Sequence, residues 1–213
     1  MDYKTFYGSP AQPEVWRNLD EYLLTPWVHE CGVSLRIVIC CIDTGGHHTK
    51  EAYVFVKPRQ VRGIRAVKGI NQPSRPIVGR PSTNNEAGVN LFPVGSDTAK
   101  ESIYARLKIE EHGPWYMHFP LHYDQEYFMQ LCGEKVVTRY VKGFPVRQWI
   151  KTRARNEALD CRVYNMVALA LSGINLDQAL SWVAKQGEAL REGKPLPEQP
   201  GVRRRLIHPG IEL

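Results

Sequence analysis

Hydrophobic positions divide the chain into strand-like segments first and helix-like segments later. The longest apolar run, residues 35–42, is interrupted only by Arg36. Such a run is typical of a central strand that is covered on both faces. Short apolar runs at 53–56 and 64–67 follow closely, which predicts an antiparallel meander attached to that strand. We therefore expect a sheet to form from the first half of the chain.

The remaining segments alternate between helical and strand patterns. Residues 71–88 are rich in Pro, Ser, Asn and Gly and are expected to form a long loop. Leu159, Val163, Met166, Val167 and Ala170 recur at helical spacing and define the buried stripe of a helix that begins near residue 156. The other predicted elements are helices at 13–24, 98–107, 124–134 and 176–191, strands at 89–97 and 116–119, and a hairpin at 135–151.

Size and composition fit one α/β domain. The 213 residues are 43% hydrophobic, which is enough for one substantial core. We place this domain at 29–192, after an arm at 1–28 and before a Pro-rich basic tail at 193–213. No apolar stretch approaches the roughly 20 residues of a membrane span, and no signal pattern is present. The five cysteines are widely spaced and odd in number, which favours reduced thiols and a cytosolic protein without membrane association.

Positive charge is concentrated in two segments of the chain. The formal net charge is +6, and residues 57–80 and 135–155 each carry seven basic residues and no acidic one. Clustered cations suit a polyanion, because each neutralised phosphate releases condensed counterions. The alternative is two solvated basic surfaces without a ligand. The pattern favours nucleic acid as the partner.

Three aspartates lie at the ends of predicted elements. Asp43 follows the apolar run at 35–42, Asp97 ends the strand at 89–97, and Asp160 lies in the first turns of a late helix. A carboxylate at the end of a buried strand loses hydration unless a cation or several donors replace the water. Mg²⁺ and Mn²⁺ take oxygen ligands, and two such ions about 3.5–4 Å apart serve phosphodiester hydrolysis. We hypothesise that these acids form a metal site.

Each acid also has a structural interpretation. Asp97 or Thr98 is a plausible cap for the following helix, and Asp160 is equally explained as a surface acid or one paired with an arginine. Glu157 lies one turn before Asp160 and only about 60° around the helix, so either acid or both can face a common site. The pattern alone does not decide between these alternatives.

A zinc site beside Asp43 is a weaker hypothesis. His47 and His48 follow Cys40 and Cys41 at short distance in the chain. Adjacent side chains point in opposite directions along a strand, and no second ligand pair at metal spacing is present. We therefore favour ordinary loop positions for both histidines, with a role in positioning water or phosphate as the alternative.

Five segments in a fixed order carry a family resemblance. They are IDTGGHHT at 42–49, VKG at 67–69, VGSDTAK at 94–100, MHFP at 117–120 and RNEALDC at 155–161. In this order they resemble the C-terminal nuclease domain of the large terminase subunit of lambda-like tailed bacteriophages. The resemblance covers about residues 27–172, which makes it far more specific than any single short motif.

This resemblance implies an RNase H-like (retroviral-integrase-like) fold, with a mixed β-sheet flanked by helices. It implies a metal-dependent endonuclease that cuts concatemeric viral double-stranded DNA during packaging, with two Mg²⁺ or Mn²⁺ ions as cofactors. Tyr164 fits the family's Asp-x-x-x-Tyr pattern. Glu157 is the nearest substitute for the third acid, and Glu51 or Glu86 for the second. The family's metal-holding acids correspond to Asp43, Asp97 and Asp160.

Cations near these acids are expected to hold the DNA backbone. In this family a hairpin such as the one at 135–151 controls access of DNA to the site. Its cations should set affinity and salt dependence, not sequence choice. The candidate DNA-binding residues are Lys68, Lys100, Lys135, Arg139, Lys142, Arg147, Lys151, Arg153 and Arg155.

The family's full subunit also carries an N-terminal ATPase motor. Its Gly-x-x-x-x-Gly-Lys-[Ser/Thr] loop is absent from this sequence, and the arm at 1–28 resembles the linker between motor and nuclease. We expect an excised nuclease domain that is monomeric alone and acts in the host cytoplasm. In the full-length protein its partners would be the motor, the small terminase subunit and the procapsid portal. The alternative is a non-catalytic basic DNA-binding or packaging-scaffold module of the same fold.

Overall fold

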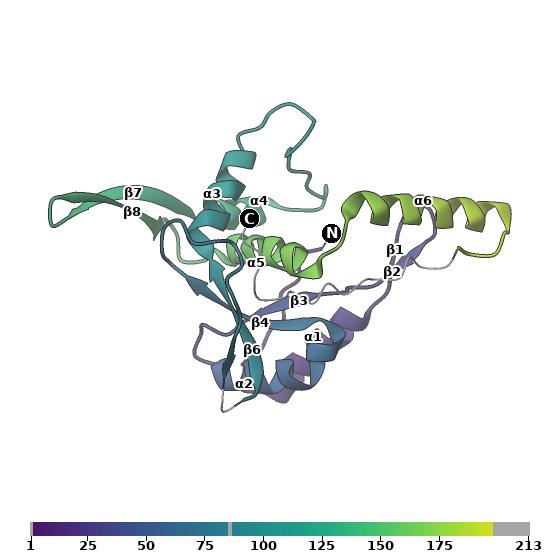
Figure 1. The fold of residues 1–213 in the computed structure, drawn as a ribbon, viewed down its shortest axis with the longest axis horizontal. Coiled ribbons are helices and arrows are strands. Elements are labelled where there is room, and N and C mark those ends of the chain that lie inside the picture. Colours follow the sequence, from purple (N-terminus) through teal and green to yellow (C-terminus); the bar gives the residue numbers. More distant parts are fainter. Residues whose placement is uncertain (1, 85–86, 198–213) are drawn as a thin grey trace.

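A mixed sheet forms the centre of the protein (Figure 1). The computed structural model describes residues 2–84 and 87–197. Strands β3, β4 and β6 run parallel, and β5 runs antiparallel to β6. The carboxyl ends of the parallel strands therefore meet at one edge, and the predicted mixed α/β architecture is confirmed. Within the described residues the strand order is β3 (Cys40–Asp43), β4 (Ile64–Ile70), β6 (Val89–Gly95) and β5 (Ser82–Asn84).

The connection from β3 to β4 is helical. It consists of α2 (Thr49–Val56) and the 3-10 helix η1 (Lys57–Arg62). The predicted strand at 53–56 and its antiparallel meander are therefore wrong. Ala52 and Val56 are buried one helical turn apart, which is the spacing of an amphipathic helix. Two parallel strands also need a crossover of about this length, whereas a short turn would reverse the chain.

The apolar run at 35–42 lies at an edge of the sheet. Only its last residues join β3, while β2 (Ser34–Leu35) pairs with β1 (Trp27–Val28) in a separate antiparallel ribbon. Val38 is 60% exposed, and Asp43 at the end of β3 is exposed as well. The prediction of a central strand covered on both faces, with a dehydrated Asp43, is therefore wrong.

Helices cover both faces of the sheet (Figure 1). Neighbouring residues of β4 alternate between two cores, since Ala66 packs with α1 and α2 and Val67 packs with the helices of the opposite face. The helices predicted at 13–24, 98–107 and 124–134 are present as α1 (Pro13–Leu24), α3 (Ser96–Arg106) and α4 (Gln125–Leu131). The helices α3, α4 and α5 (Glu157–Ser172) share the second core.

The helix α5 presents most of its predicted apolar stripe to the sheet. Leu159, Val163 and Val167 are fully buried, and Met166 is partly buried. Ala170 is exposed, so the stripe ends earlier than predicted. This packing fixes the first turns of α5 against the core.

Two elements project from the body on opposite sides (Figure 1). The predicted hairpin is confirmed as β7 (Glu134–Val141) and β8 (Phe144–Lys151), and α6 (Leu176–Glu192) extends on the other side. The strand predicted at 116–119 has no regular structure. The tail predicted at 193–213 lies outside the described residues from 198 onward. No single helix among the described residues is long and apolar enough to cross a membrane; α5 and α6 meet that criterion only as a pair bent by 85°.

Candidate active site

An open cavity of about 660 Å³ lies at the carboxyl edge of the parallel strands. Its walls come from the loop after β3, the end of β4, the first turns of α3 and α5, and β8. The three predicted acids, which are 54 and 63 positions apart in sequence, reach this one cavity. The ionisable side chains that line it are Asp43, Lys68, Asp97, Lys100, Glu134, Arg147, Lys151, Asp160 and Tyr164.

Asp43 is oriented by the turn that follows β3. The Gly45 N–H donates a hydrogen bond of 2.8 Å to Asp43 Oδ1. Thr44 is buried, and its hydroxyl donates to the Val67 carbonyl at 3.0 Å, which ties the turn to β4. Tyr164 on α5 lines the same cavity, and burial together with the nearby Asp43 carboxylate raises the pKa of the Tyr164 phenol. The turn after β3 therefore orients the carboxylate.

Asp97 lies in the first turn of α3 and lines the cavity. It does not cap the helix: Gly95 is the N-cap residue, and no side chain accepts a capping hydrogen bond there. Burial raises the pKa of Asp97, and nearby Glu101 and Glu134 add to the effect while Lys100 opposes it. The alternative of a simple cap is therefore wrong.

Asp160 lies in the first turn of α5, partly buried in the cavity wall. Burial raises the pKa of Asp160, and the carboxylates of Glu134 and Asp43 raise it further. Lys100 and Lys151 act in the opposite direction. The charges of Asp160 and Asp43 therefore interact within the cavity.

Glu134 is a fourth acid of the cavity, and the sequence pattern did not predict it. It is 5% exposed at the start of β7, where its Oε2 lies 2.7 Å from Lys100 Nζ. Its Oε1 accepts a hydrogen bond of 2.6 Å from Asn156 Nδ2. The Tyr104 hydroxyl donates to its backbone carbonyl at 2.6 Å. One signal was available: Glu134 is the acid that immediately precedes the acid-free segment 135–155.

The same ion pair gives Lys100 a structural role. Lys100 was a candidate contact to DNA, but it is 7% exposed and its ammonium group is engaged by Glu134. The pair joins α3 to the base of the hairpin, and Asn156 extends the connection to α5. Lys100 therefore holds the cavity wall together.

The other candidate DNA contacts fall into two groups. Lys68, Arg147 and Lys151 line the cavity and are exposed, although Arg147 also lies 3.0 Å from Glu101. Three further exposed cations lie on β7 and its turn: Lys135 at the base of the hairpin, Arg139 toward its end and Lys142 in the turn. We call these six exposed cations the basic strip; Lys135 and Arg139 share one face of the hairpin ribbon, and Arg147 and Lys151 share the other.

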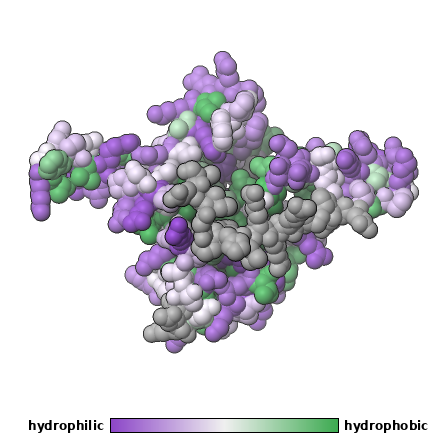
Figure 2. Space-filling model, in the orientation of Figure 1, coloured by the Kyte–Doolittle hydropathy of each residue, from purple (hydrophilic) through white to green (hydrophobic). Residues whose placement is uncertain are grey.

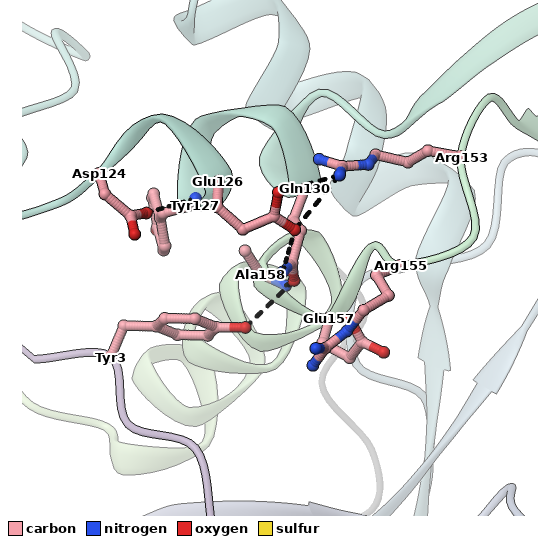
Figure 3. A network of polar contacts seen from close by, with 9 residues as sticks. All are labelled: Tyr3, Asp124, Glu126, Tyr127, Gln130, Arg153, Arg155, Glu157 and Ala158. Atoms are coloured by element: carbon pink, nitrogen blue, oxygen red, sulfur yellow. Dashed lines mark hydrogen bonds and ion pairs between the residues drawn. The ribbon is translucent and has the colours of Figure 1, made fainter.

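Arg153 and Arg155 are engaged by acids outside the cavity (Figure 3). Arg153 is partly buried and makes two hydrogen bonds to Glu126, at 3.2 and 3.0 Å. Arg155 Nε lies 3.3 Å from a carboxylate oxygen of Glu157. Glu157 is exposed and does not line the cavity, so the structure does not bring this substitute acid to the site.

The cavity acids fit divalent cations by their chemistry. Asp43, Asp97 and Asp160 line one cavity, and repulsion from the carboxylates of Glu134 and Asp43 contributes to the raised pKa of Asp160. A bound cation would relieve that repulsion and replace lost hydration. In the described part of the chain, no three His, Cys, Asp or Glu side chains are grouped closely enough to hold an ion as they stand.

Other proposed ligands lie elsewhere. Burial raises the pKa of the Cys40 thiol to about 12, and neither Cys40 nor Cys41 lines the cavity. His48 lies 3.9 Å from Glu51, and neither residue lines the cavity. Glu86 falls outside the described residues. Of the ligands proposed from the sequence, Asp43, Asp97 and Asp160 are the acids that line the cavity.

Comparisons with known proteins agree with this chemistry. Residues 1–182 match the family model described as terminase large subunit gpA, endonuclease domain. The chain is 33% identical over 198 residues to the large terminase subunit of Enterobacteria phage P21, a match that covers 88% of this chain and 30% of the relative. It is 31% identical over 179 residues to that of Escherichia phage lambda, covering 81% and 28%.

The matches cover a small part of the relatives but most of this chain. It spans less than a third of the length of these curated relatives, which are matched over 30% and 28% of their residues. No solved structure matches it. The family match nevertheless covers most of the chain. The chain belongs to the endonuclease-domain family of the terminase large subunit.

Proposed function

We propose that this chain is a metal-dependent endonuclease that cuts concatemeric viral double-stranded DNA during genome packaging. The observation that carries the proposal is the convergence of Asp43, Asp97 and Asp160 on one cavity beside a basic hairpin. Family membership supports a nuclease role in packaging. The site would act in the host cytoplasm.

We assign the domain to the RNase H-like folds. In support, the acids follow the order of that superfamily, with one on the first strand of the sheet, one after a later strand, and one on a C-terminal helix. The parallel β3–α2–β4 connection differs from the antiparallel meander that we expected after the first strand. The assignment therefore rests on the placement of the acids and on the mixed sheet.

Asp43, Asp97 and Asp160 would hold two Mg²⁺ or Mn²⁺ ions. When bound, such ions lower the pKa of water and stabilise the leaving oxygen of a phosphodiester. The Gly45 N–H orients the Asp43 carboxylate, and Tyr164 lines the cavity beside it. Lys100 and Glu134 hold α3 against the base of the hairpin, which keeps the walls of the cavity in register.

The basic strip would position the DNA backbone beside the acids. Lys68 and Lys151 line the cavity, where their charges would offset those of a bound phosphate. The hairpin cations carry the backbone outward from the cavity. The isolated chain would be monomeric, and in a full-length subunit the ATPase motor, the small terminase subunit and the portal would be its partners.

The test is loss of cutting in Asp43→Ala. The unsubstituted chain with Mn²⁺ should convert supercoiled plasmid to nicked and linear forms, and EDTA should stop the reaction. Asp43→Ala should reduce the rate at least 100-fold, because the cavity loses a metal ligand. Circular dichroism and thermal melting would show that the variant stays folded.

Two further variants sharpen this test. Asp177→Ala removes an exposed acid from α6 and should leave cutting unchanged. Glu157→Ala should also cut, since Glu157 lies outside the cavity. Undiminished cutting by Asp43→Ala would overturn the site. DNA binding without any cutting by the unsubstituted chain would favour the non-catalytic DNA-binding or scaffold role.

A further inference from the structure

The outer end of the β7–β8 hairpin carries a cluster of exposed apolar side chains. Tyr140 is 75% exposed, Val141 54%, Phe144 73% and Val146 39%. Apolar surface is visible toward the end of the projecting hairpin in Figure 2. Exposed apolar residues scattered singly need no explanation, but a contiguous group marks an interaction surface. We call these four residues the hairpin tip.

The turn makes the hairpin tip narrow. Lys142 and Gly143 form a two-residue connection with φ values of 52° and 82°, so both have left-handed backbone. Turns of this kind continue the natural twist of the two strands and keep them close together. Val141 lies opposite Phe144 in the pairing. The ribbon therefore ends in the Lys142-Gly143 turn, with Val141 and Phe144 as a narrow apolar pair directly behind it.

The charge around the hairpin tip indicates the partner. Residues 135–155 contain seven cations and no acid, and Arg139 and Lys142 are exposed beside the apolar side chains. The same strand continues into the cavity wall, which Val146 and Lys151 line. A polyanion bound at the cavity and followed along the basic strip would reach the tip. Duplex DNA offers both phosphates for the cations and apolar base faces for the aromatic ring.

We propose that the hairpin tip inserts Phe144 and Val141 between neighbouring base pairs of the DNA and kinks the duplex beside the cutting site. The inference rests on the proposed function and deepens it. DNA-bending proteins use side chains such as Phe, Leu, Ile, Met and Pro as wedges, which partly unstack a base step from the minor groove. Phe144-Pro145 at the narrow end of a basic ribbon has this chemistry.

The geometry also bounds where the kink falls. At about 3.3 Å per strand residue, Phe144 lies roughly 7 Å beyond Val146 and roughly 23 Å beyond Lys151 at the cavity. With about 3.4 Å per base pair, the wedge acts between about two and seven base pairs from the cavity. Flexible pyrimidine–purine steps unstack more readily than A-tracts. A TA step at this position should therefore be preferred.

Fluorescence of 2-aminopurine measures the insertion directly. Duplexes of about 16 base pairs would carry this base at one TA step. The 213-residue chain would be added in the presence of Ca²⁺, which takes the same kind of oxygen ligands as Mg²⁺. Electrophoresis afterwards would confirm that the duplex was not cut. Insertion should raise the fluorescence severalfold on binding. The double variant Val141→Ala/Phe144→Ala should lose at least three quarters of that rise and any preference for TA over an A-tract.

Matched variants separate insertion from simple attraction. Lys142→Gln should lower the salt dependence of binding by about one unit of slope, yet keep the fluorescence rise once the DNA is saturated. Leu180→Ala removes an exposed apolar residue from α6 and should change neither quantity. Circular dichroism would confirm the fold of each variant.

Three results would contradict the insertion of the hairpin tip. If the chain binds duplex without a fluorescence rise, or if the Val141→Ala/Phe144→Ala variant keeps the rise, the wedge is wrong while the DNA role stands. In that case the hairpin tip serves a protein contact, and sedimentation would show whether that contact is a second copy of the chain. If no duplex is bound at all, the wedge and the DNA role of the proposed function both fail.

Discussion

Glu134 and Lys100 form the most buried ion pair described in the structure, with side chains 5% and 9% exposed and 2.7 Å apart. Removing one member leaves the other charge buried without its partner. Lys100→Met should therefore lower the free energy of unfolding by about 3–5 kcal/mol, measured by urea denaturation.

A double variant tests this reasoning. Lys100→Met/Glu134→Gln leaves no buried charge and keeps an acceptor for Asn156, so it should recover more than half of the loss. An additive loss in the double variant would contradict a direct interaction. Comparison of the two single variants with the double variant also measures the energetic coupling between the hairpin base and α3.

Asp160 should be a cost to stability at neutral pH. Because burial raises its pKa above the ordinary 3.8, the folded chain binds this proton more tightly than the unfolded chain. Stability is then lost as pH rises from about 3.8 through the raised value. Asp160→Asn should have a higher Tm than the unsubstituted chain at pH 7 and the same Tm at about pH 3.

Calorimetry at both pH values would check this expectation. Added Mn²⁺ should stabilise the unsubstituted chain more than Asp160→Asn, because the variant lacks a charged ligand. A lower Tm of the variant at pH 7 would show that Asp160 makes favourable charged contacts that outweigh its burial.

Gly69 shows how closely the strands and helices meet at the cavity. A Cβ at this position of β4 would lie 2.7 Å from Ser96 Oγ on α3 and 3.7 Å from the Tyr164 hydroxyl on α5. Gly69→Ala should therefore cost about 1–3 kcal/mol of stability. Removing the opposing oxygen in Gly69→Ala/Ser96→Ala should restore most of it.

The matched control is Gly113→Ala. A methyl group added at Gly113 would meet no other atom within 4 Å, so this substitution should change stability by less than about 0.5 kcal/mol. Urea denaturation of all three variants measures the differences. Equal effects at both glycines would mean that chain flexibility, not the close approach at β4, sets the loss.

Elements with a strong local pattern were predictable. The helix at 13–24 and the hairpin at 135–151 follow from apolar spacing and from the turn at Lys142-Gly143, and both are present. The segment 53–56 misled because four apolar residues in a row fit a strand and a buried helix equally well. The run at 35–42 misled because hydrophobicity does not reveal whether a strand has a neighbour on each side.

The acids at element ends were predictable, and the buried network was not. Asp43, Asp97 and Asp160 stand out because each begins or ends a patterned segment, and all three line the cavity. Glu134 begins β7 without an apolar run before it, and its role depends on Lys100 and Asn156, which are 34 and 22 positions away. Such pairs form only through tertiary packing.

Positive charge is distributed unevenly over the molecule. The basic hairpin extends from one side of the body and α6 from the other (Figure 1). If DNA lies along the basic strip, its affinity depends on where the cations are and not on the net charge of +6. Salt dependence separates these cases, because each phosphate contact contributes about 0.9 to the slope of log affinity against log salt.

Arg139→Gln/Lys142→Gln should therefore flatten this slope by about 1.8 in fluorescence anisotropy titrations with a short duplex. The matched control, Lys185→Gln/Arg191→Gln, removes the same charge from α6 and should change the slope by less than about 0.5. Equal changes in the two variants would show that DNA responds to net charge alone. A loss confined to the hairpin variant would place the duplex along β7 and β8.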